Sequence, residues 1–230
     1  ILCDSNFYII FFIKRIKSFL YPYKLRLESF LSIKPLILWN WYSRRQCTNP
    51  PPTIIKHKIL LRHGIQFANW IETGTFIGET TKFLSKNYPR VHTIEASNKC
   101  LEIAKKYVGR KSNITFYQGT SEDLFESILK KQKGSVNIWL DAHFSSGITY
   151  EGANLSSIIS ELLSISKDIN KFEKIAVFID DIDGHFFDPK SYPKIDYYVE
   201  WANNNKLNWL IENNIFIAKT KIIGSELCIR

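Results

Sequence analysis

Acidic residues that follow two apolar stretches carry the clearest chemistry in this sequence. Asp141 follows the β-rich run 136–140, and Asp180 and Asp181 follow the run 175–179. If these runs are neighbouring parallel strands, the three carboxylates meet at one edge of the sheet, where they repel one another and raise one another's pKa. A hard cation such as Mg²⁺ resolves that conflict because it prefers oxygen ligands. The sequence therefore predicts a metal site of Asp141, Asp180 and Asp181. A loop that caps a helix is the alternative explanation of the acidic pair.

A glycine turn follows the first predicted strand. Residues 70–81 read Trp-Ile-Glu-Thr-Gly-Thr-Phe-Ile-Gly-Glu-Thr-Thr, which predicts the end of a buried strand, a turn and the start of a helix. Free N–H groups at a helix N-terminus favour polar or anionic ligands. The spacing of Gly74 and Gly78 differs from the G-x-G-x-x-G pattern that binds a dinucleotide pyrophosphate. A plain tight connection between strand and helix is the alternative interpretation, so the turn depends on its surroundings for a function.

The elements that must position these residues alternate along the chain. Apolar, β-rich runs predict one strand that ends near Thr73 and four more strands over 90–95, 114–117, 136–140 and 175–179. Helical spacing of apolar residues predicts helices over 98–108, 121–131, 154–166 and 195–204, and Ser121 is the expected cap of the second. Two strand-like runs within 209–218 flank an Asn213-Asn214 turn. This order predicts an α/β fold with a Rossmann-like, doubly wound, mostly parallel sheet and a terminal antiparallel hairpin.

Polar residues stand at the carboxyl end of each predicted parallel strand. They are Glu72, Glu95, Thr120, Ser121, Asp141, Asp180 and Asp181, with Gly119 directly before Thr120. In open α/β sheets, ligands bind in the crevice beyond these strand ends. Caps and loops explain one or two such residues but not a complete row, so the row indicates a ligand site.

Residues 68–219 resemble the class I S-adenosylmethionine-dependent methyltransferases. The segment Glu72-Thr-Gly-Thr-Phe-Ile-Gly78 is similar to the E-x-G-x-x-x-G form of their first motif. The resemblance implies that Glu72, Thr73, Gly74, Thr75 and Gly78 lie along the methionine part of S-adenosylmethionine. It places Glu95 on the ribose, and Gly119, Thr120 and Ser121 near the adenine, with Asp141 also in the cofactor site. Many relatives carry an acid where this chain has Thr120.

A narrower resemblance concerns the metal-dependent sugar and catechol O-methyltransferases. Their metal ligands are an Asp after the fourth strand and an acidic pair after the fifth, which correspond here to Asp141, Asp180 and Asp181. In the sugar enzymes a general base lies two residues past the first ligand, and His143 occupies that place. An imidazole titrates near neutral pH and can accept a hydroxyl proton. The resemblance thus implies Mg²⁺-assisted O-methylation of a sugar or another small hydroxyl compound.

Three functions from different classes stay open, and the first is the metal-dependent O-methyltransferase described above. Pro50-Pro51-Pro52, the following helix, and the L-D-A-H and I-D-D motifs also resemble unassigned methyltransferases of bacterial surface-polysaccharide clusters, which favours a glycan acceptor. A metal-independent methyltransferase acting on another nucleophile is the second function. The third is a non-catalytic, membrane-associated binding protein, which the basic N-terminus and Thr120 favour.

The N-terminal quarter differs in charge from the rest of the chain. Residues 1–60 carry a net charge of +8, whereas residues 61–230 carry +1. We therefore divide the chain into a basic, aromatic-rich helical extension (1–50), a helix before the first strand (51–67) and the cofactor-binding domain (68–230). The apolar run 7–13 is shorter than the roughly 20 residues that span a bilayer.

The partners of the extension follow from its composition. Interleaved basic and aromatic residues over 7–45 suit an anionic membrane surface, a helix packed on the domain is the main alternative, and a nucleic acid is the least favoured partner because the domain is nearly neutral. The four cysteines lack a C-x-x-C pair, which favours free thiols in a reducing cytoplasm. We therefore expect a cytoplasmic protein, peripheral at the inner face of the membrane. The absence of methionine suggests that the true start is missing.

Overall fold

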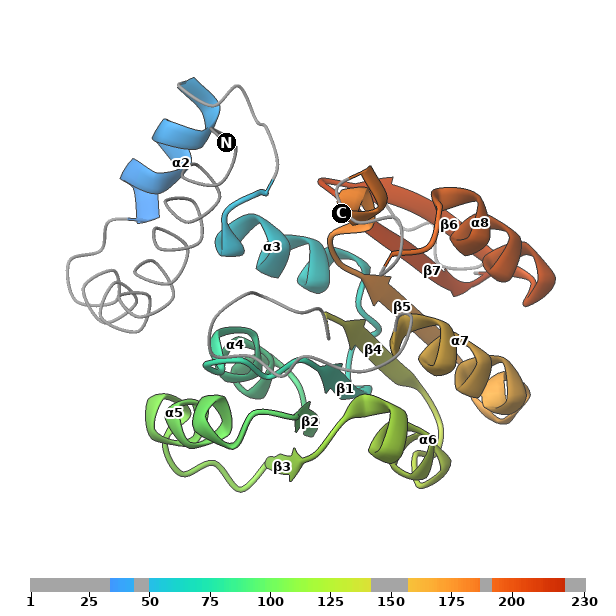
Figure 1. The fold of residues 1–230 in the computed structure, drawn as a ribbon, viewed down its shortest axis with the longest axis horizontal. Helices are drawn as coiled ribbons and strands as arrows, with labels where there is room; N and C mark the ends of the chain where they lie inside the picture. The colour runs from blue at the N-terminus through green and yellow to red at the C-terminus, as the bar shows by residue number, and fades with distance from the viewer. Residues whose placement is uncertain (1–33, 44–49, 142–156, 187–191, 222–230) are drawn as a thin grey trace, which may run out of the picture.

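Among the described residues, one sheet of seven strands forms the centre, in the order β3-β2-β1-β4-β5-β7-β6 (Figure 1). The computed structural model describes residues 34–43, 50–141, 157–186 and 192–221. The strands are β1 (Asn69–Thr73), β2 (Val91–Glu95), β3 (Ile114–Gln118), β4 (Val136–Leu140), β5 (Ile175–Ile179), β6 (Leu207–Glu212) and β7 (Ile215–Thr220). The strands β1 to β5 pair in parallel, and β7 pairs antiparallel with both β5 and β6.

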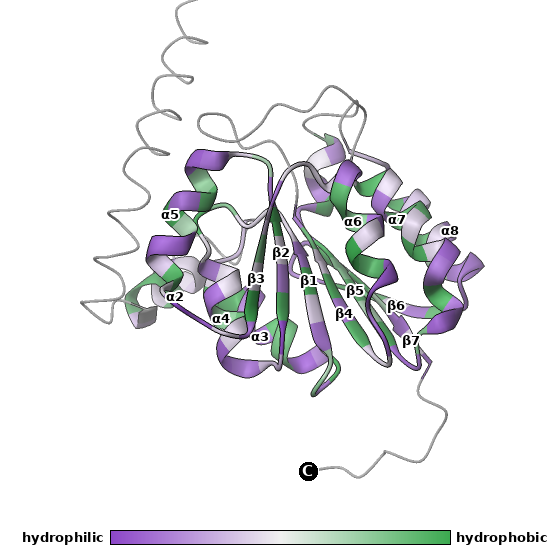
Figure 2. Cartoon of the chain, turned by 90° about the horizontal axis from the view of Figure 1, so that it is seen from below, coloured by the Kyte–Doolittle hydropathy of each residue, from purple (hydrophilic) through white to green (hydrophobic). Residues whose placement is uncertain are grey.

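Helices cover both faces of the sheet (Figure 2). The helices α3 (Thr53–His63), α4 (Glu79–Asn87) and α5 (Asn98–Val108) lie on one face, and α6 (Ser121–Lys130), α7 (Ser157–Asp168) and α8 (Ile195–Asn204) on the other. The remaining described helices are α2 (Lys34–Ser43) and the short 3₁₀ helices η1 (Ile169–Lys171) and η2 (Ile182–Phe186). This is the three-layer arrangement expected of a parallel sheet.

The central strands are buried on both faces because nearly every residue in them is apolar. All five residues of β4 and all five of β5 are buried. Alternate side chains point to opposite faces of a strand. Accordingly, Trp139 and Phe178 join the core under α3 and α4, while Ile138 and Val177 join the core under α6, α7 and α8. A strand of consecutive apolar residues therefore provides an apolar surface for the helices on both faces of the sheet.

The predicted α/β fold with a terminal hairpin is confirmed. Asn213 and Asn214 both have positive φ (48° and 68°), as a two-residue hairpin turn requires, and Glu212 pairs with Ile215 across it. Helix α7 ends two residues later than expected, at Asp168, and its expected first residues lie outside the described part of the chain. No helix in the part of the chain that the structure describes is long and apolar enough to cross a membrane.

The predicted cap of α6 was wrong by one residue. Thr120, not Ser121, is the N-cap, and its hydroxyl accepts a hydrogen bond from the backbone N–H of Asp123 (3.4 Å). Both residue types cap helices well, so the sequence does not distinguish neighbouring positions. Thr120 thereby has a structural function that accounts for its place after the glycine.

Candidate active site

The predicted site residues gather at the carboxyl edge of the parallel strands. Backbone hydrogen bonds continue the sheet past the strand ends: from Asp141 to Thr73 (3.2 Å), from Asp180 to Leu140 (3.0 Å) and from Gly119 to Glu95 (3.0 Å). Every residue of the predicted site row therefore lies at the edge of β1, β2, β3, β4 or β5. His143 lies outside the described residues.

The turn between β1 and α4 needs its glycines for two different reasons. Gly74 and Gly78 have φ of 81° and 83°, which L side chains rarely adopt. At Gly78 there is also no room, because a Cβ would lie 2.8 Å from Cγ2 of Val108 and 3.1 Å from Cβ of Ala104, both on α5. The turn is thus pressed against the next helix of the same face, which fixes its position.

Replacement of Gly78 by Ala tests that packing. We expect it to lower the free energy of unfolding by about 3 kcal/mol, from both the unfavourable φ and the clash with Val108. Gly134 offers a control, since it has φ of 68° but an added Cβ would meet nothing within 4 Å, so Gly134→Ala should cost only about 1–2 kcal/mol. Urea denaturation measures both variants. Equal losses would show that the contact with α5 does not matter.

Glu95 fastens the end of β2 to this turn. Its Oε2 accepts a hydrogen bond from the N–H of Phe76 (2.7 Å), and its Oε1 accepts one from the N–H of Ser97 (2.9 Å). Burial raises the pKa of Glu95, and these two N–H groups offset part of that rise. Each carboxylate oxygen has a second lone pair, so Glu95 can still accept two hydrogen bonds from a ligand. Phe76 itself has positive φ (50°), which is uncommon for a residue other than glycine.

Glu72 is a buried acid with one oxygen in use. Its Oε2 accepts a hydrogen bond from the hydroxyl of Thr81 (2.5 Å), whereas its Oε1 has no hydrogen-bond partner among the described residues. Burial raises the pKa of Glu72 to about 8, and the hydroxyls of Thr81 and Thr93 offset only part of the rise. The side chain is therefore mainly neutral at pH 7 when no ligand is bound. Such an incomplete buried group marks a place where a ligand can complete the hydrogen bonding.

Most of the other residues that were predicted to contact the cofactor are buried or already form hydrogen bonds within the fold. The hydroxyls of Thr75 and Thr93 lie 2.5 Å apart and share a hydrogen bond, and Thr73 is fully buried. Thr120 donates its hydroxyl hydrogen to Asp123 (2.7 Å). Gly119 has φ of 147°, and a Cβ there would lie 2.7 Å from Leu124. These residues shape the backbone of the edge, and Ser121 is buried beside them.

The three predicted acidic ligands form a cluster. Asp141, Asp180 and Asp181 each offer a carboxylate oxygen, and these oxygens all lie within 4.8 Å of one another. Asp180 is buried, and its Oδ1 has no hydrogen-bond partner among the described residues. Its pKa is raised well above the usual value because of burial and because Asp141 repels the charged form. The arrangement fits the oxygen-rich donor set of a hard divalent cation.

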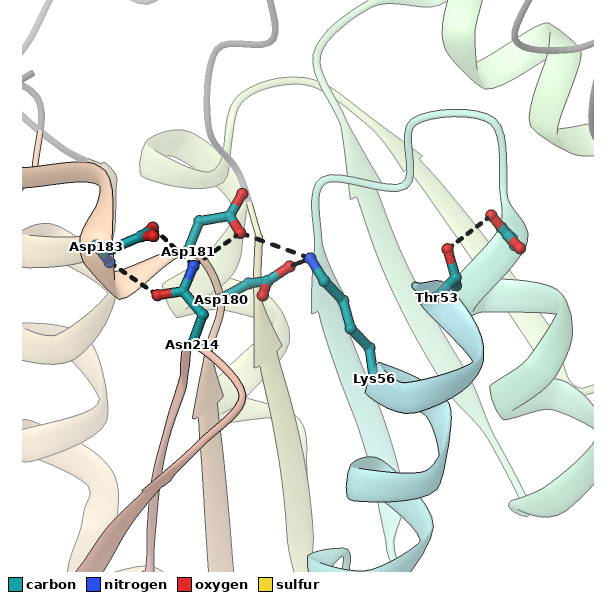
Figure 3. A network of polar contacts seen from close by, with 7 residues as sticks. Thr53, Lys56, Asp180, Asp181, Asp183 and Asn214 are labelled. Carbon is teal, nitrogen blue, oxygen red and sulfur yellow. Dashed lines mark hydrogen bonds and ion pairs between the residues drawn. The ribbon is translucent and has the colours of Figure 1, made fainter. Parts of the chain in front are cut away.

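Two residues that contact this acidic cluster were not predicted (Figure 3). Lys56 reaches over from α3: its Nζ contacts Oδ2 of Asp180 and lies 3.6 Å from Oδ1 of Asp181. Burial alone would lower the pKa of Lys56, but the attraction of Asp180, and then of Asp141 and Asp181, raises it. Asn214 of the hairpin turn donates from Nδ2 to Asp183 (2.7 Å) and to Asp181 (3.5 Å), and its Oδ1 accepts from the N–H of Asp183 (3.0 Å).

One signal in the sequence points to Lys56. Ile55, Ile59 and Leu60 are the buried residues of α3, and Lys56 precedes Ile59 by three positions and Leu60 by four. Residues at these spacings share one face of a helix, so a lysine stands on an apolar face. A charged residue on a buried face usually has a partner of opposite charge. Thr53 could have capped α3 by residue type, but it is the first helical residue and donates its hydroxyl hydrogen to Glu79 (3.3 Å).

Comparison with known proteins supplies a fold. No model of a protein family matches the sequence, and neither does any curated protein. Among solved structures, the N-methyltransferase NodS from Bradyrhizobium japonicum WM9 is 13% identical, with a TM-score of 0.50 over 74% of this chain and 96% of NodS. A complex of NodS with S-adenosyl-L-homocysteine has a TM-score of 0.49 at 13% identity over 76% of this chain and 94% of that one. A putative rRNA-methylase from Clostridium thermocellum has a TM-score of 0.48 at 13% identity, over 75% of this chain and 97% of that one. The described domain of this protein therefore has the fold of the class I methyltransferases.

Proposed function

We propose that this protein is an S-adenosylmethionine-dependent methyltransferase that methylates a hydroxyl oxygen of a sugar or related small molecule, with a divalent cation in the acidic cluster. The observation that carries the proposal is the cluster itself: three carboxylate oxygens within 4.8 Å, one of them on fully buried Asp180, at the sheet edge that also holds the glycine turn. The fold supplies the edge, and the cluster supplies the reason to favour an oxygen nucleophile.

The residues of the edge fit the proposed cofactor. Bound S-adenosylmethionine supplies an activated methyl group on its sulfonium. Glu72 Oε1 is buried without a partner and suits the α-ammonium group of the methionine part. Glu95 uses one lone pair of each oxygen for the backbone and keeps the others for the ribose hydroxyls. Gly74 and Gly78 keep the turn free of side chains, while Gly119, Thr120 and Ser121 border the adenine end.

The residues of the cluster divide the chemistry of the acceptor. A divalent cation held by Asp141, Asp180 and Asp181 would lower the pKa of a substrate hydroxyl. In our proposal His143, two residues after Asp141, accepts the hydroxyl proton. The remaining task of the site is alignment, since an in-line displacement requires the nucleophile behind the methyl carbon. A glycan acceptor of a surface-polysaccharide pathway is the substrate class that the sequence favours.

Calorimetry tests the cofactor separately from the acceptor. Titration of the full chain with S-adenosyl-L-homocysteine should give saturable binding, and Glu95→Gln should weaken it about tenfold or more because the ribose loses a charged acceptor. Glu173→Gln, a change at an exposed position after η1, is the matched control and should bind as the wild type does. No detectable binding at millimolar ligand would rule out the proposal.

The metal-independent methyltransferase is the second candidate, and one observation favours it. The ammonium group of Lys56 already contacts Asp180, so the positive charge of this side chain partly neutralises the cluster. If that charge is sufficient, S-adenosyl-L-homocysteine binds but divalent ions do not. Titration with Mn²⁺ separates the two candidates.

We also propose that α2 contacts an anionic membrane surface. Leu36, Trp39 and Tyr42 recur every three residues on this helix and are 62%, 56% and 60% exposed, whereas Trp41 is buried against the domain. Aromatic and apolar residues beside a basic segment suit the headgroup region. Substitution of all three by Ser should lower co-sedimentation with phosphatidylserine vesicles at least tenfold. Phe67→Ser, which alters an exposed apolar residue outside α2, is the control and should not. Equal binding of both variants would contradict this contact.

A further inference from the structure

We infer that Lys56 is a counter-cation built into the chain, which holds Asp180 and Asp181 in the absence of a metal ion and competes with a divalent cation for them. This inference rests on the metal site of the proposed function and concerns how that site is controlled. It assigns a function to a residue of α3, an element that precedes the cofactor-binding strands.

The contacts of Lys56 are those a metal ion would need. Its Nζ contacts Oδ2 of Asp180 and lies 3.6 Å from Oδ1 of Asp181. The three carboxylate oxygens of the cluster lie within 4.8 Å of one another, so there is little room between them. A divalent ion bound there would stand close to the ammonium group and be repelled by it. The two cations therefore oppose each other at the same two aspartates.

The charges show that Lys56 fills the cluster only in part. When all three carboxylates are ionised they carry three negative charges, and one lysine then leaves a net of two, which is the charge of one divalent ion. The geometry agrees, because Oδ1 of the buried Asp180 has no hydrogen-bond partner among the described residues while Oδ2 is paired with Lys56. Buried carboxylate oxygens normally find a partner. The cluster is thus stabilised by Lys56 but still able to attract a second cation.

The place of Lys56 in α3 permits an exchange. Ile55, Ile59 and Leu60 hold the helix against the sheet, so the backbone stays in place. The side chain of Lys56 is 17% exposed and ends in a flexible four-carbon stem. Its ammonium group can swing toward water when an ion enters, without movement of the helix. In Figure 3 the extended side chain of Lys56 reaches from α3 to Asp180 and Asp181.

Binding of Mn²⁺ alone, followed by electron paramagnetic resonance on the full chain, tests this competition. Lys56→Met removes the charge at similar length, and Lys56→Gln removes it but keeps a hydrogen-bond donor, which guards against a folding failure of the first variant. We expect both to bind Mn²⁺ about tenfold or more tightly than the wild type. Lys58→Met changes an exposed lysine of the same helix and should match the wild type. Mn²⁺ should also raise the urea midpoint of both Lys56 variants more than that of the wild type.

The outcomes separate this inference from the proposed function. Tighter binding by both Lys56 variants, with Lys58→Met unchanged, supports the competition. Equal Mn²⁺ affinity of all four proteins overturns it but leaves the metal site intact. Absence of Mn²⁺ binding in all four, with S-adenosyl-L-homocysteine still bound, overturns both the competition and the metal site while methyl transfer stands.

Discussion

Removal of either partner of the Lys56–Asp180 pair is expected to destabilise the metal-free protein by about 3–5 kcal/mol, because each change leaves the other charge largely buried. The side chain of Lys56 is 17% exposed and that of Asp180 is fully buried, so water screens the pair little. Lys56→Met and Asp180→Asn should therefore each shift urea unfolding strongly. The double variant should lose much less than the sum, because the carboxylates that remain, Asp141 and Asp181, are only partly buried and water can solvate them.

A double-mutant cycle measures this coupling. In chelator-containing buffer we expect a coupling free energy of about 2 kcal/mol or more between Lys56 and Asp180. Glu102 and Lys105 form an exposed pair on α5, with side chains 51% and 45% exposed, and supply a matched cycle that should give at most about 0.5 kcal/mol. Strictly additive losses for Lys56 and Asp180 would contradict the pairing and the competition built on it.

The sheet edge was predictable from the sequence because it follows from a rule of topology. Parallel strands end at the same edge, so the order of the runs was enough to bring Glu72, Glu95 and Asp141 together. The acidic pair Asp180-Asp181 was placed with them for the same reason. The hairpin was predictable because Asn tolerates positive φ, which Asn213 and Asn214 both adopt. Local chemistry and topology point to the same answer at each of these positions.

The partners of the cluster were not predictable in the same way. Lys56 is 124 residues from Asp180 in the sequence, and a lysine in a helix is usually a solvated residue. Only the folded position of α3 across the sheet brings its ammonium group to the cluster. Asn214 was assigned to a turn, and that assignment is right, but its side chain also orients Asp181 and Asp183. A residue with two functions shows only one of them in its sequence pattern.

Glu72 makes the stability of the protein depend on pH in a direction opposite to that of an ordinary acid. Its pKa is about 8 in the folded state because of burial, against an ordinary value of 4.5 in the unfolded chain. Between these values the unfolded chain releases a proton that the folded protein keeps. Stability therefore falls as pH rises from about 4.5 to 8, by about 1.4 kcal/mol per pH unit from this one group.

Glu72→Gln should remove that dependence, since the amide mimics the protonated acid and its oxygen can still accept a hydrogen bond from Thr81. In cofactor-free buffer we expect the variant to equal the wild type near pH 4.5 and to exceed it by roughly 3 kcal/mol at pH 7. The difference between the two proteins isolates Glu72 from Glu95 and Asp180, whose pKa values are raised as well. Glu173→Gln, at an exposed position, should leave the slope unchanged. Parallel stability curves for Glu72→Gln and the wild type would mean that Glu72 is ionised in the fold. The unpaired oxygen that we assign to the α-ammonium group of the cofactor would then carry a charge before the cofactor binds.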